Sequence, residues 1–299
     1  MHANKVVFCT GGGGTICSAQ VQALVSLGAN ACIVGRNEEK TNNVAEKIAS
    51  TRNGSHVLGI GNIDVRKLDS LQAAVRQCIQ TLEHINYVIY GAAGNFLAPI
   101  DKLSANAFKS VVDIDLLGSY HTLKATIPHL LESAARNTNP GRTIGGRIIF
   151  ISATFHFTGV PFQAHVASAK AGVDALSASV ALEYGPHGVT SNVISPGCIQ
   201  GTEGMERLSS KEMRESGSAG RDVPLGRYGL VKEVSDATVY LFSETGNYVN
   251  GHVLVIDGGA WRLPGLDDIS KGFTYPDIVL QGADLQGDIK TGRRSTSNI

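Results

Sequence analysis

Short, mostly apolar runs alternate along the chain with longer stretches in which apolar residues recur at helical spacing. The apolar runs predict strands at 6–9, 31–34, 57–63, 87–90, 147–151, 189–194 and 253–256. The stretches between them predict helices near 16–27, 38–50, 68–82, 104–131, 163–183 and 232–242. Strands that are apolar throughout are typical of a parallel sheet covered on both faces. The alternation therefore predicts an α/β fold with a doubly wound parallel sheet.

The pattern gives no internal repeat and no linker between domains. We therefore expect a single domain over 1–261, followed by a C-terminal tail over 262–299, which lacks clear periodicity. The segment Ser133–Gly146 is rich in Asn, Thr, Pro and Gly and predicts a surface loop.

Composition excludes several classes of protein. Hydrophobic residues make up 42% of the 299 residues, which is ample for a core and excludes disordered, collagen-like and coiled-coil chains. The 26 basic and 26 acidic side chains balance, which argues against nucleic-acid and polybasic membrane partners. No apolar run approaches the roughly 20 residues of a membrane span. The five cysteines form no CxxC pair and favour reduced intracellular thiols over disulfides, and no metal site is predicted.

A glycine-rich turn, Thr10-Gly11-Gly12-Gly13-Gly14, lies between the first predicted strand and the first predicted helix. In a βαβ unit, such a turn lets backbone N–H groups and the helix N-terminus face a pyrophosphate without obstruction by side chains. A tight loop is the simpler interpretation of glycines alone. The position in the first βα turn favours a dinucleotide site.

The end of the second strand, Val34-Gly35-Arg36-Asn37, bears on the choice of dinucleotide. An NAD site usually has a carboxylate there for the ribose 2′-hydroxyl, and this chain has none. The guanidinium of Arg36 suits a 2′-phosphate, which predicts NADPH, although Arg36 can also be a solvated surface residue. Asp64 and Val65 end the third strand and either face the adenine or, for Asp64, cap the next helix.

Several motifs resemble the short-chain dehydrogenase/reductase family, in its order, from about residue 6 to 261. They are Thr10–Ile16, Asp64-Val65, Gly91-Ala92-Ala93-Gly94, Lys170, Ser195-Pro196-Gly197 and Asp257-Gly258-Gly259. Longer strings are most similar to the peroxisomal 2,4-dienoyl-CoA reductases, particularly the fungal ones: Ala92–Phe96, Asn106–Asp115, Ser152–His156 and Gly201–Gly204. The resemblance implies a Rossmann fold of the short-chain dehydrogenase/reductase type.

The resemblance also implies a set of cofactor-binding residues, in which Lys170 holds the nicotinamide ribose and the Ile199 backbone holds the carboxamide. The set is Gly11, Gly14, Thr15, Ile16, Arg36, Asn37, Asp64, Val65, Ala92, Lys170, Pro196, Gly197 and Ile199.

The chain departs from typical members of the family at three catalytic positions. Val166 stands where they have the catalytic Tyr, Ala153 where they have the Ser, and Asp115 where they have a helix Asn. Valine cannot supply a proton, so carbonyl–alcohol interconversion through a Tyr–Lys relay is excluded.

The resembled reductases carry out a reaction that this departure fits. Hydride from NADPH reaches the far end of a 2,4-dienoyl thioester, and the extended enolate is protonated at the α carbon to give 3-enoyl-CoA in unsaturated fatty acid oxidation. By resemblance, Asn95 holds the thioester carbonyl, Phe96 lines the acyl pocket and Asp115 is the acid, with Lys170 beside it. An acid at neutral pH must be desolvated or lie beside an anion, and the apolar neighbours of Asp115 favour desolvation.

Alternatives remain open at each of these positions. Asn95 can be a turn residue, Lys170 a surface lysine and Asp115 a capping or ion-pairing group. Asp113 is the rival acid, and on a helix it lies about 200° from Asp115, so only one of them can face the site. His156 and His165 are interpreted as pocket walls.

The segment 201–222 is the expected substrate lid by resemblance. Its basic residues either meet the phosphates of CoA or are solvated: Lys211, Arg214 and Arg221. The helices near 104–131 and 163–184 match those that resembled enzymes use in oligomers, so a homo-oligomer is expected. Resemblance places the protein in the peroxisome, whereas the terminal Ser297-Asn298-Ile299 does not match a Ser-Lys-Leu signal and leaves the cytoplasm as the alternative. Acyl chain length and double-bond geometry are not given by the sequence.

Two other functions remain open. One is a divergent reductase for another conjugated or imine substrate in a biosynthetic pathway. The other is a non-catalytic NADPH-binding protein, because the chain lacks both the Tyr and the Ser of typical members.

Overall fold

The computed structural model describes residues 2–136, 145–208 and 223–263. Seven parallel strands form one sheet in the order β3-β2-β1-β4-β5-β6-β7. The strands are β1 (Val6–Thr10), β2 (Asn30–Val34), β3 (Val57–Ile60), β4 (Tyr87–Tyr90), β5 (Gly146–Ile151), β6 (Val189–Pro196) and β7 (Val253–Ile256). The predicted doubly wound parallel sheet is confirmed.

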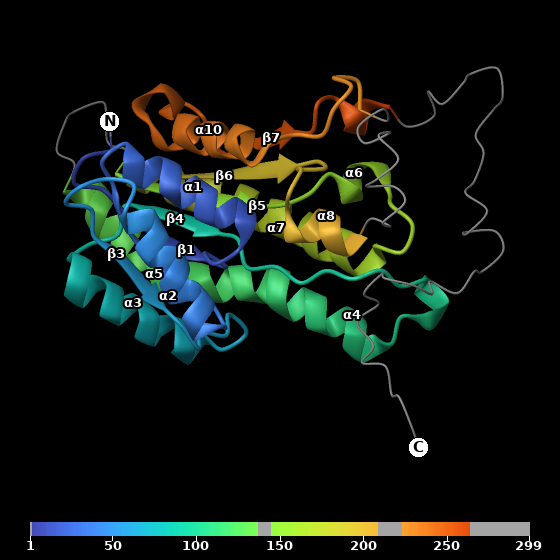
Figure 1. The fold of residues 1–299 in the computed structure, drawn as a ribbon, viewed down its shortest axis with the longest axis horizontal. Helices are drawn as coiled ribbons and strands as arrows, with labels where there is room; N and C mark the ends of the chain where they lie inside the picture. The colour runs from blue at the N-terminus through green and yellow to red at the C-terminus, as the bar shows by residue number, and fades with distance from the viewer. Residues whose placement is uncertain (1, 137–144, 209–222, 264–299) are drawn as a thin grey trace.

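Helices cover both faces of this sheet (Figure 1). Helices α1, α2 and α10 lie on one face, and α3, α5 and α7 lie on the other. The helices are α1 (Thr15–Ser26), α2 (Glu38–Ala49), α3 (Leu68–Leu82), α4 (Ala105–Val112), α5 (Gly118–Ala135), α6 (Phe155–Thr158), α7 (Ala164–Tyr184), α8 (Glu203–Leu208) and α10 (Val231–Phe242). A π-helical turn, η2 (Asp113–Leu117), joins α4 to α5. The short 3₁₀ turns are η1 (Ile100–Lys102), η3 (Gly185–His187), η4 (Glu244–Gly246) and η5 (Ala260–Arg262).

The alternation of side chains along each strand divides the core into two layers. Along β1, Val6 and Phe8 pack with α3 and α5, whereas Val7 and Cys9 pack with α1 and α10. All four side chains are at most 1% exposed, so both faces of the strand are buried. This burial explains why Val6–Cys9 of β1 is continuously apolar rather than alternately polar.

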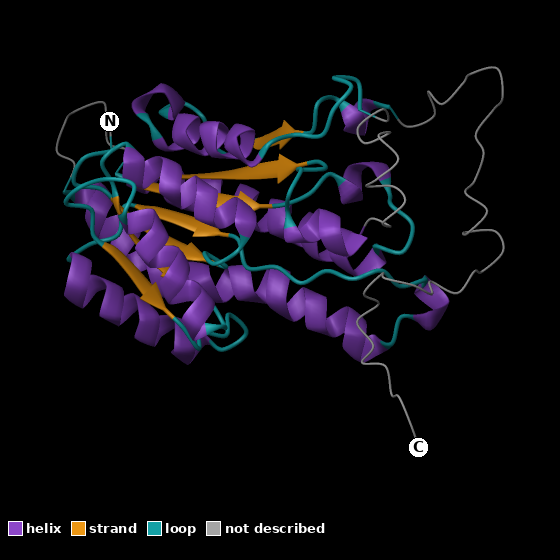
Figure 2. Cartoon of the chain, in the orientation of Figure 1, coloured by secondary structure: helices purple, strands orange, loops and turns teal. Residues whose placement is uncertain are grey.

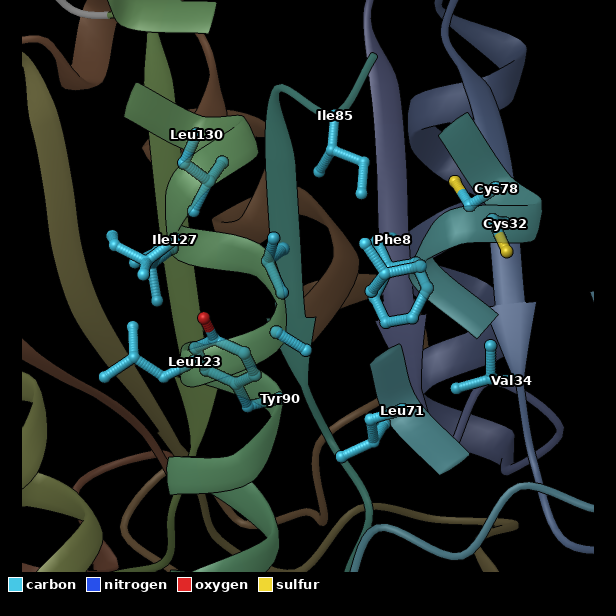
Figure 3. Packing of buried hydrophobic residues seen from close by; sticks show 14 of the residues in the cluster. Phe8, Cys32, Val34, Leu71, Cys78, Ile85, Tyr90, Leu123, Ile127 and Leu130 are labelled. Carbon is cyan, nitrogen blue, oxygen red and sulfur yellow. The ribbon is translucent and has the colours of Figure 1, made fainter. Parts of the chain in front are cut away.

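Figure 3 shows the layer on the side of α3 and α5. Leu123, Ile127 and Leu130 project from one face of α5, where residues three and four apart are neighbours. On the other side of the view, Phe8 of β1 lies beside Leu71 of α3. These contacts fix the helices against the sheet and so fix the loops at the ends of the strands.

The carboxyl ends of the parallel strands meet at one edge of the sheet, and the arrows in Figure 2 all point toward it. The glycine-rich turn follows β1 there, and the loops after β4, β5 and β6 reach the same edge. In doubly wound sheets, ligands bind outside this edge, where the strand order reverses on the two sides of β1.

Two expectations about the helices need correction. The helix predicted over 104–131 is interrupted by the π-helical turn and continues to Ala135. The predicted loop is therefore shorter than Ser133–Gly146, because its first residues are helical and Gly146 belongs to β5. The buried Ser133 hydroxyl donates to the Ile85 carbonyl at 2.6 Å, which holds the end of α5 on the core.

Within the described residues, no helix combines the length and apolar character needed to cross a bilayer. The same residues contain no group of three or more His, Cys, Asp or Glu side chains arranged to hold a metal. The five cysteines are free thiols; Cys198 is exposed and the others are buried: Cys9, Cys17, Cys32 and Cys78.

Candidate active site

The glycine-rich turn after β1 is packed so closely that side chains do not fit at two of its positions. A Cβ on Gly11 would lie 2.8 Å from the Ala92 nitrogen, and the residue has a positive φ of 67°. A Cβ on Gly12 would lie 2.5 Å from the Ile33 side chain of β2. These two glycines let the turn lie against the ends of β4 and β2.

The N-terminus of α1 opens from this turn without a side-chain cap. Gly14 is its N-cap residue, and its first turn contains no acidic side chain. A Cβ on Gly13 would meet nothing closer than 3.8 Å, so this position is not crowded. Unpaired N–H groups and the positive end of the helix dipole favour an anion at this position.

A cleft of about 730 Å³ extends from this helix end along the edge of the sheet. Its size is typical of a small-molecule site. It brings together most of the predicted binding residues: Gly11, Gly14, Thr15, Ile16, Arg36, Asn37, Asp64, Val65, Ala92 and Asn95. Sequence reasoning missed other residues that line it: Lys40, Thr41, Ile114, Ile151, Thr202 and Glu203.

One end of the cleft, after β2 and β3, carries charged residues, of which some have a partner among the described residues and one does not. Arg36 is exposed, and no described residue makes a hydrogen bond or ion pair with it. Asn37 caps α2 by accepting from the Lys40 backbone N–H at 2.8 Å. Asp64 is held by Arg66 at 2.6 Å, and this hydrogen bond lowers the pKa of the Asp64 carboxyl. Arg36 is therefore the cation in this region that is available to a ligand.

A buried ion pair forms the other end of the site. The Asp115 carboxylate, 1% exposed, accepts from the Gly94 N–H at 2.7 Å and lies 3.0 Å from the Lys170 ammonium. Lys170 of α7 also donates to the Ile151 carbonyl at the end of β5, at 3.0 Å. Three elements thus converge on one pair of opposite charges. Asp115 is desolvated as expected, and its charged partner is a cation rather than an anion.

The π-helical turn separates the two candidate carboxylates. Asp113 pairs with the exposed Lys109, whereas Asp115 points into the protein toward Lys170. The Ser119 hydroxyl donates to the Asp115 backbone carbonyl at 2.5 Å and helps to hold this turn. Isolated π turns within helices are frequent at functional sites. The geometry favours Asp115, while its role as an acid stays a prediction.

Asn95 lies at the border between the cleft and this ion pair. Its side-chain oxygen is buried, and no described group donates to it. Buried polar atoms are almost always paired, so an orphaned oxygen in a cleft fits a ligand that supplies a donor. The uncapped helix end and the exposed Arg36 fit the phosphates of a dinucleotide in the same cleft.

An apolar wall stands next to Asn95. The Phe96 ring packs on the His165 ring with centroids 4.3 Å apart, in a cluster with Val111, Val166 and Phe155. His165 is fully buried, and burial lowers its pKa, so the imidazole is neutral at pH 7. Val166 is 3% exposed within this cluster and offers no proton. The contact with Phe96 agrees with the interpretation of His165 as a pocket wall.

Sequence reasoning missed a second, largely buried acid, Asp174, one turn after Lys170 on α7. Its carboxylate lies 2.9 Å from the His156 ring of α6. Burial raises the pKa of Asp174, against the opposing effects of Ser152, His156 and Lys170. His156, interpreted as a pocket wall, thus lies in direct contact with the Asp174 carboxyl group. The spacing of Lys170 and Asp174, one helical turn, is the signal in the sequence from which Asp174 could have been found.

The predicted residues after β6 lie at the same edge of the sheet but not on the wall of the cleft. The Gly197 N–H donates to the Ile256 carbonyl at 2.9 Å, and Ile199 forms a bridge with Gly229. Lys170, Asp115 and Phe96 also lie outside the lining residues. The three basic residues expected in the lid fall outside the described residues: Lys211, Arg214 and Arg221.

Comparison with known proteins gives consistent results. A family model described as enoyl-(acyl carrier protein) reductase matches residues 13–260. The peroxisomal 2,4-dienoyl-CoA reductase of Saccharomyces cerevisiae, named as (3E)-enoyl-CoA-producing, is 48% identical over 88% of this chain and 86% of its own. The enzyme of the same name from Danio rerio is 38% identical over 90% of this chain and 85% of its own. The crystal structure of a short chain dehydrogenase from Bacillus anthracis gives a TM-score of 0.75 at 30% identity, over 92% of this chain and 100% of the other.

Proposed function

The chain belongs to the short-chain dehydrogenase/reductase family, and from that premise we propose that it reduces 2,4-dienoyl-CoA to 3-enoyl-CoA with NADPH. The observation that carries this proposal is the buried Asp115–Lys170 pair beside an apolar wall that contains Val166. A site with a buried acid, and with Val166 at the position where typical family members have a Tyr hydroxyl, suits protonation of carbon rather than of a carbonyl oxygen. The relatives named above carry the same activity in their names.

When bound, NADPH supplies the hydride. The hydride adds to the δ carbon of the dienoyl thioester, and the electrons move through the diene to the thioester oxygen. The remaining double bond lies between the β and γ carbons, and a proton on the α carbon completes 3-enoyl-CoA. The protein must therefore stabilise an oxyanion and deliver one proton at a distance from the hydride.

We assign the oxyanion to the side-chain amide N–H groups of Asn95, which can donate to it and which lie at the border of the cleft. We assign the proton to Asp115 and Lys170 acting together, because the Lys170 ammonium lies 3.0 Å from the Asp115 carboxylate. Gly94 donates to the other carboxylate oxygen and fixes its direction. This rigid hold favours one orientation of the acid toward the substrate.

Phe96, His165 and Val166 exclude water from the acyl side of the site, which strengthens the electrostatic contacts inside it. At the opposite end, the exposed Arg36 with no carboxylate beside it on the strand supports NADPH over NADH. We also propose an acyl-CoA as the partner, a homo-oligomeric state, and the peroxisome as the compartment, following the names of the relatives.

The test is the loss of NADPH absorbance with the purified chain and a short 2,4-dienoyl-CoA. NADH and a saturated acyl-CoA of the same length serve as controls, and NMR of the product locates the double bond. We expect turnover with NADPH and a 3-enoyl product. NADPH binding without turnover, or a 2-enoyl product, contradicts the proposal.

A further inference from the structure

An ion pair joins the two sides of the cleft near its charged end. The Lys40 ammonium of α2 pairs with the Glu203 carboxylate of α8, although the two residues are 163 positions apart. Both residues line the cleft. A dinucleotide that occupies the cleft therefore meets this pair, either beneath it or in place of it.

The stem of Lys40 lies over the anion-binding end of the cleft. The nearest atom to a Cβ built on Gly13 is the Lys40 Cγ, at 3.8 Å. Lys40 lies three residues after Asn37, the N-cap of α2, and Arg36 lies one residue before it. Lys40 and Arg36 thus flank the same turn, and they are the two cationic side chains among the described residues of the lining.

The negative partner is held in place from the other side. The Thr202 hydroxyl donates to the Ile199 carbonyl at 2.8 Å and accepts from the Met205 N–H at 3.3 Å. These bonds fix the start of α8, so the Glu203 carboxylate stands over the cleft from a defined position. A phosphate entering nearby meets a cation that is already engaged and an anion that repels it.

The charges favour an exchange of partners. A 2′-phosphate carries about two negative charges at neutral pH, which a single guanidinium does not match. The Lys40 and Glu203 side chains are 48% and 45% exposed, and half-exposed ion pairs are weak. An ammonium–phosphate contact is stronger because the acceptor oxygens carry more charge.

We propose that Lys40 is a second ligand for the 2′-phosphate of the dinucleotide, and that Glu203 competes with the phosphate for it. Glu203 therefore lowers the affinity for the phosphorylated nucleotide, and binding of that nucleotide breaks the contact between α2 and α8. This inference rests on the proposed use of NADPH. It adds to that proposal Lys40 on α2 as a residue that determines specificity, and Glu203 on α8 as a residue that competes with the phosphate.

Calorimetric titration of the full chain with adenosine 2′,5′-bisphosphate and with adenosine 5′-monophosphate tests the inference. Lys40→Met keeps the stem over Gly13 and removes the charge, so it should weaken the bisphosphate about tenfold and leave the monophosphate unchanged. Lys47→Met, two turns along the exposed side of α2, is the matched control and should change neither. Salt concentration is held constant, because exposed charges are screened.

Glu203→Gln is the more decisive variant, because it is expected to increase the affinity rather than decrease it. It should tighten the bisphosphate by about threefold to fivefold, and it should have no effect when Lys40 is already Met. Weaker binding in Glu203→Gln overturns the inference, because the pair would then close over the bound nucleotide. Equal effects of Lys40→Met and Lys47→Met overturn it as well.

Failure of the inference is distinguishable from failure of the proposed cofactor. If the unaltered chain binds the bisphosphate no more tightly than the monophosphate, the use of NADPH itself is wrong, and the role of Lys40 is wrong with it. If the unaltered chain prefers the bisphosphate while the Lys40 and Glu203 variants behave like the control, only the role of Lys40 is overturned.

Discussion

The two ends of the site use different parts of the chain, one the backbone and the other side chains. At the glycine-rich end, the binding surface is backbone: an uncapped helix terminus and a turn in which Gly11 approaches Ala92 too closely for a side chain. At the other end it is side chain: Asp115 and Lys170 form a buried ion pair, joined by Gly94 and Ile151. The first end is damaged by adding a carbon atom and the second by removing a charge.

The difference teaches where each end draws its stability. The turn depends on close packing against the ends of β4 and β2, at Ala92 and Ile33, and it needs no buried charge. The ion pair joins residues 55 positions apart, and each charge is tolerated in the interior only because the other is present. Variants that remove one charge should therefore be costlier than variants that crowd the turn.

The largest expected effect follows from Asp115→Asn. It keeps an acceptor for the Gly94 N–H but leaves the buried Lys170 ammonium without its partner. We expect unfolding free energy to fall by about 3 kcal/mol. We expect kcat to fall by about 100-fold or more, because the acid is lost. Urea denaturation and steady-state assays with a dienoyl-CoA measure the two effects.

Asp113→Asn is the matched control, two residues away. Its partner Lys109 is exposed, so the change should cost no more than about 0.5 kcal/mol and leave kcat within about twofold. Nucleotide affinity should stay the same in both variants. Equal losses of activity in the two variants would remove the assignment of the acid to Asp115.

The next largest effect is expected at the turn. Gly11→Ala places a Cβ 2.8 Å from the Ala92 nitrogen in addition to straining a positive φ. We expect a loss of about 2 kcal/mol in unfolding free energy and about tenfold in nucleotide affinity, because the turn must move away from β4. Denaturation and calorimetric titration measure both.

Gly54→Ala separates strain from crowding. Gly54 has a similar φ of 74°, but a Cβ there meets nothing within 4 Å. Only the strain of about 1 kcal/mol should appear, with no change in nucleotide affinity. If Gly11→Ala costs no more than Gly54→Ala, close packing is not what requires glycine at the turn.

Arg36→Asp is expected to have a smaller effect on stability, and its effect on activity should be confined to one nucleotide. The new carboxylate should repel a 2′-phosphate and accept from a ribose hydroxyl, so kcat/KM with NADPH should fall by about 100-fold while NADH is used as well or better. Stability should change by no more than about 0.5 kcal/mol. Arg76→Asp, on an exposed position of α3, is the control. An unchanged preference for NADPH would contradict the role of Arg36.

The sequence predicted the backbone-built end better than the side-chain-built end. The strands and helices follow from periodicity within each segment, and the glycine-rich turn and Arg36 lie in or next to the first βαβ unit, where local pattern is enough. The choice between Asp113 and Asp115 required the π-helical turn, which no periodicity signals. The pairing of His156 with Asp174 depends on α6 folding over α7. The true end of α5 depends on a hydrogen bond from Ser133 to the distant Ile85.

The smallest expected effect concerns Asp174, the acid that pairs with His156 next to Lys170. Burial raises the pKa of Asp174, so the folded state holds this proton more tightly than the unfolded state does. Its contribution to stability is therefore largest at low pH and is lost as pH rises through the folded pKa. Asp174→Asn should stabilise the protein at pH 7, raising Tm by roughly 1–3 °C, with less gain at acidic pH.

Thermal denaturation of Asp174→Asn across pH 4 to 8 measures this gain, and Asp236→Asn is its control. Asp236 pairs with Lys232 on the exposed side of α10, so its replacement should bring no gain at any pH. Activity should fall in Asp174→Asn although stability rises, because the removed charge acts on Lys170. A lower Tm at pH 7 would mean that the ion pair with His156 outweighs the cost of burying the carboxylate. The charged groups near Lys170 would then stabilise the folded protein rather than destabilise it.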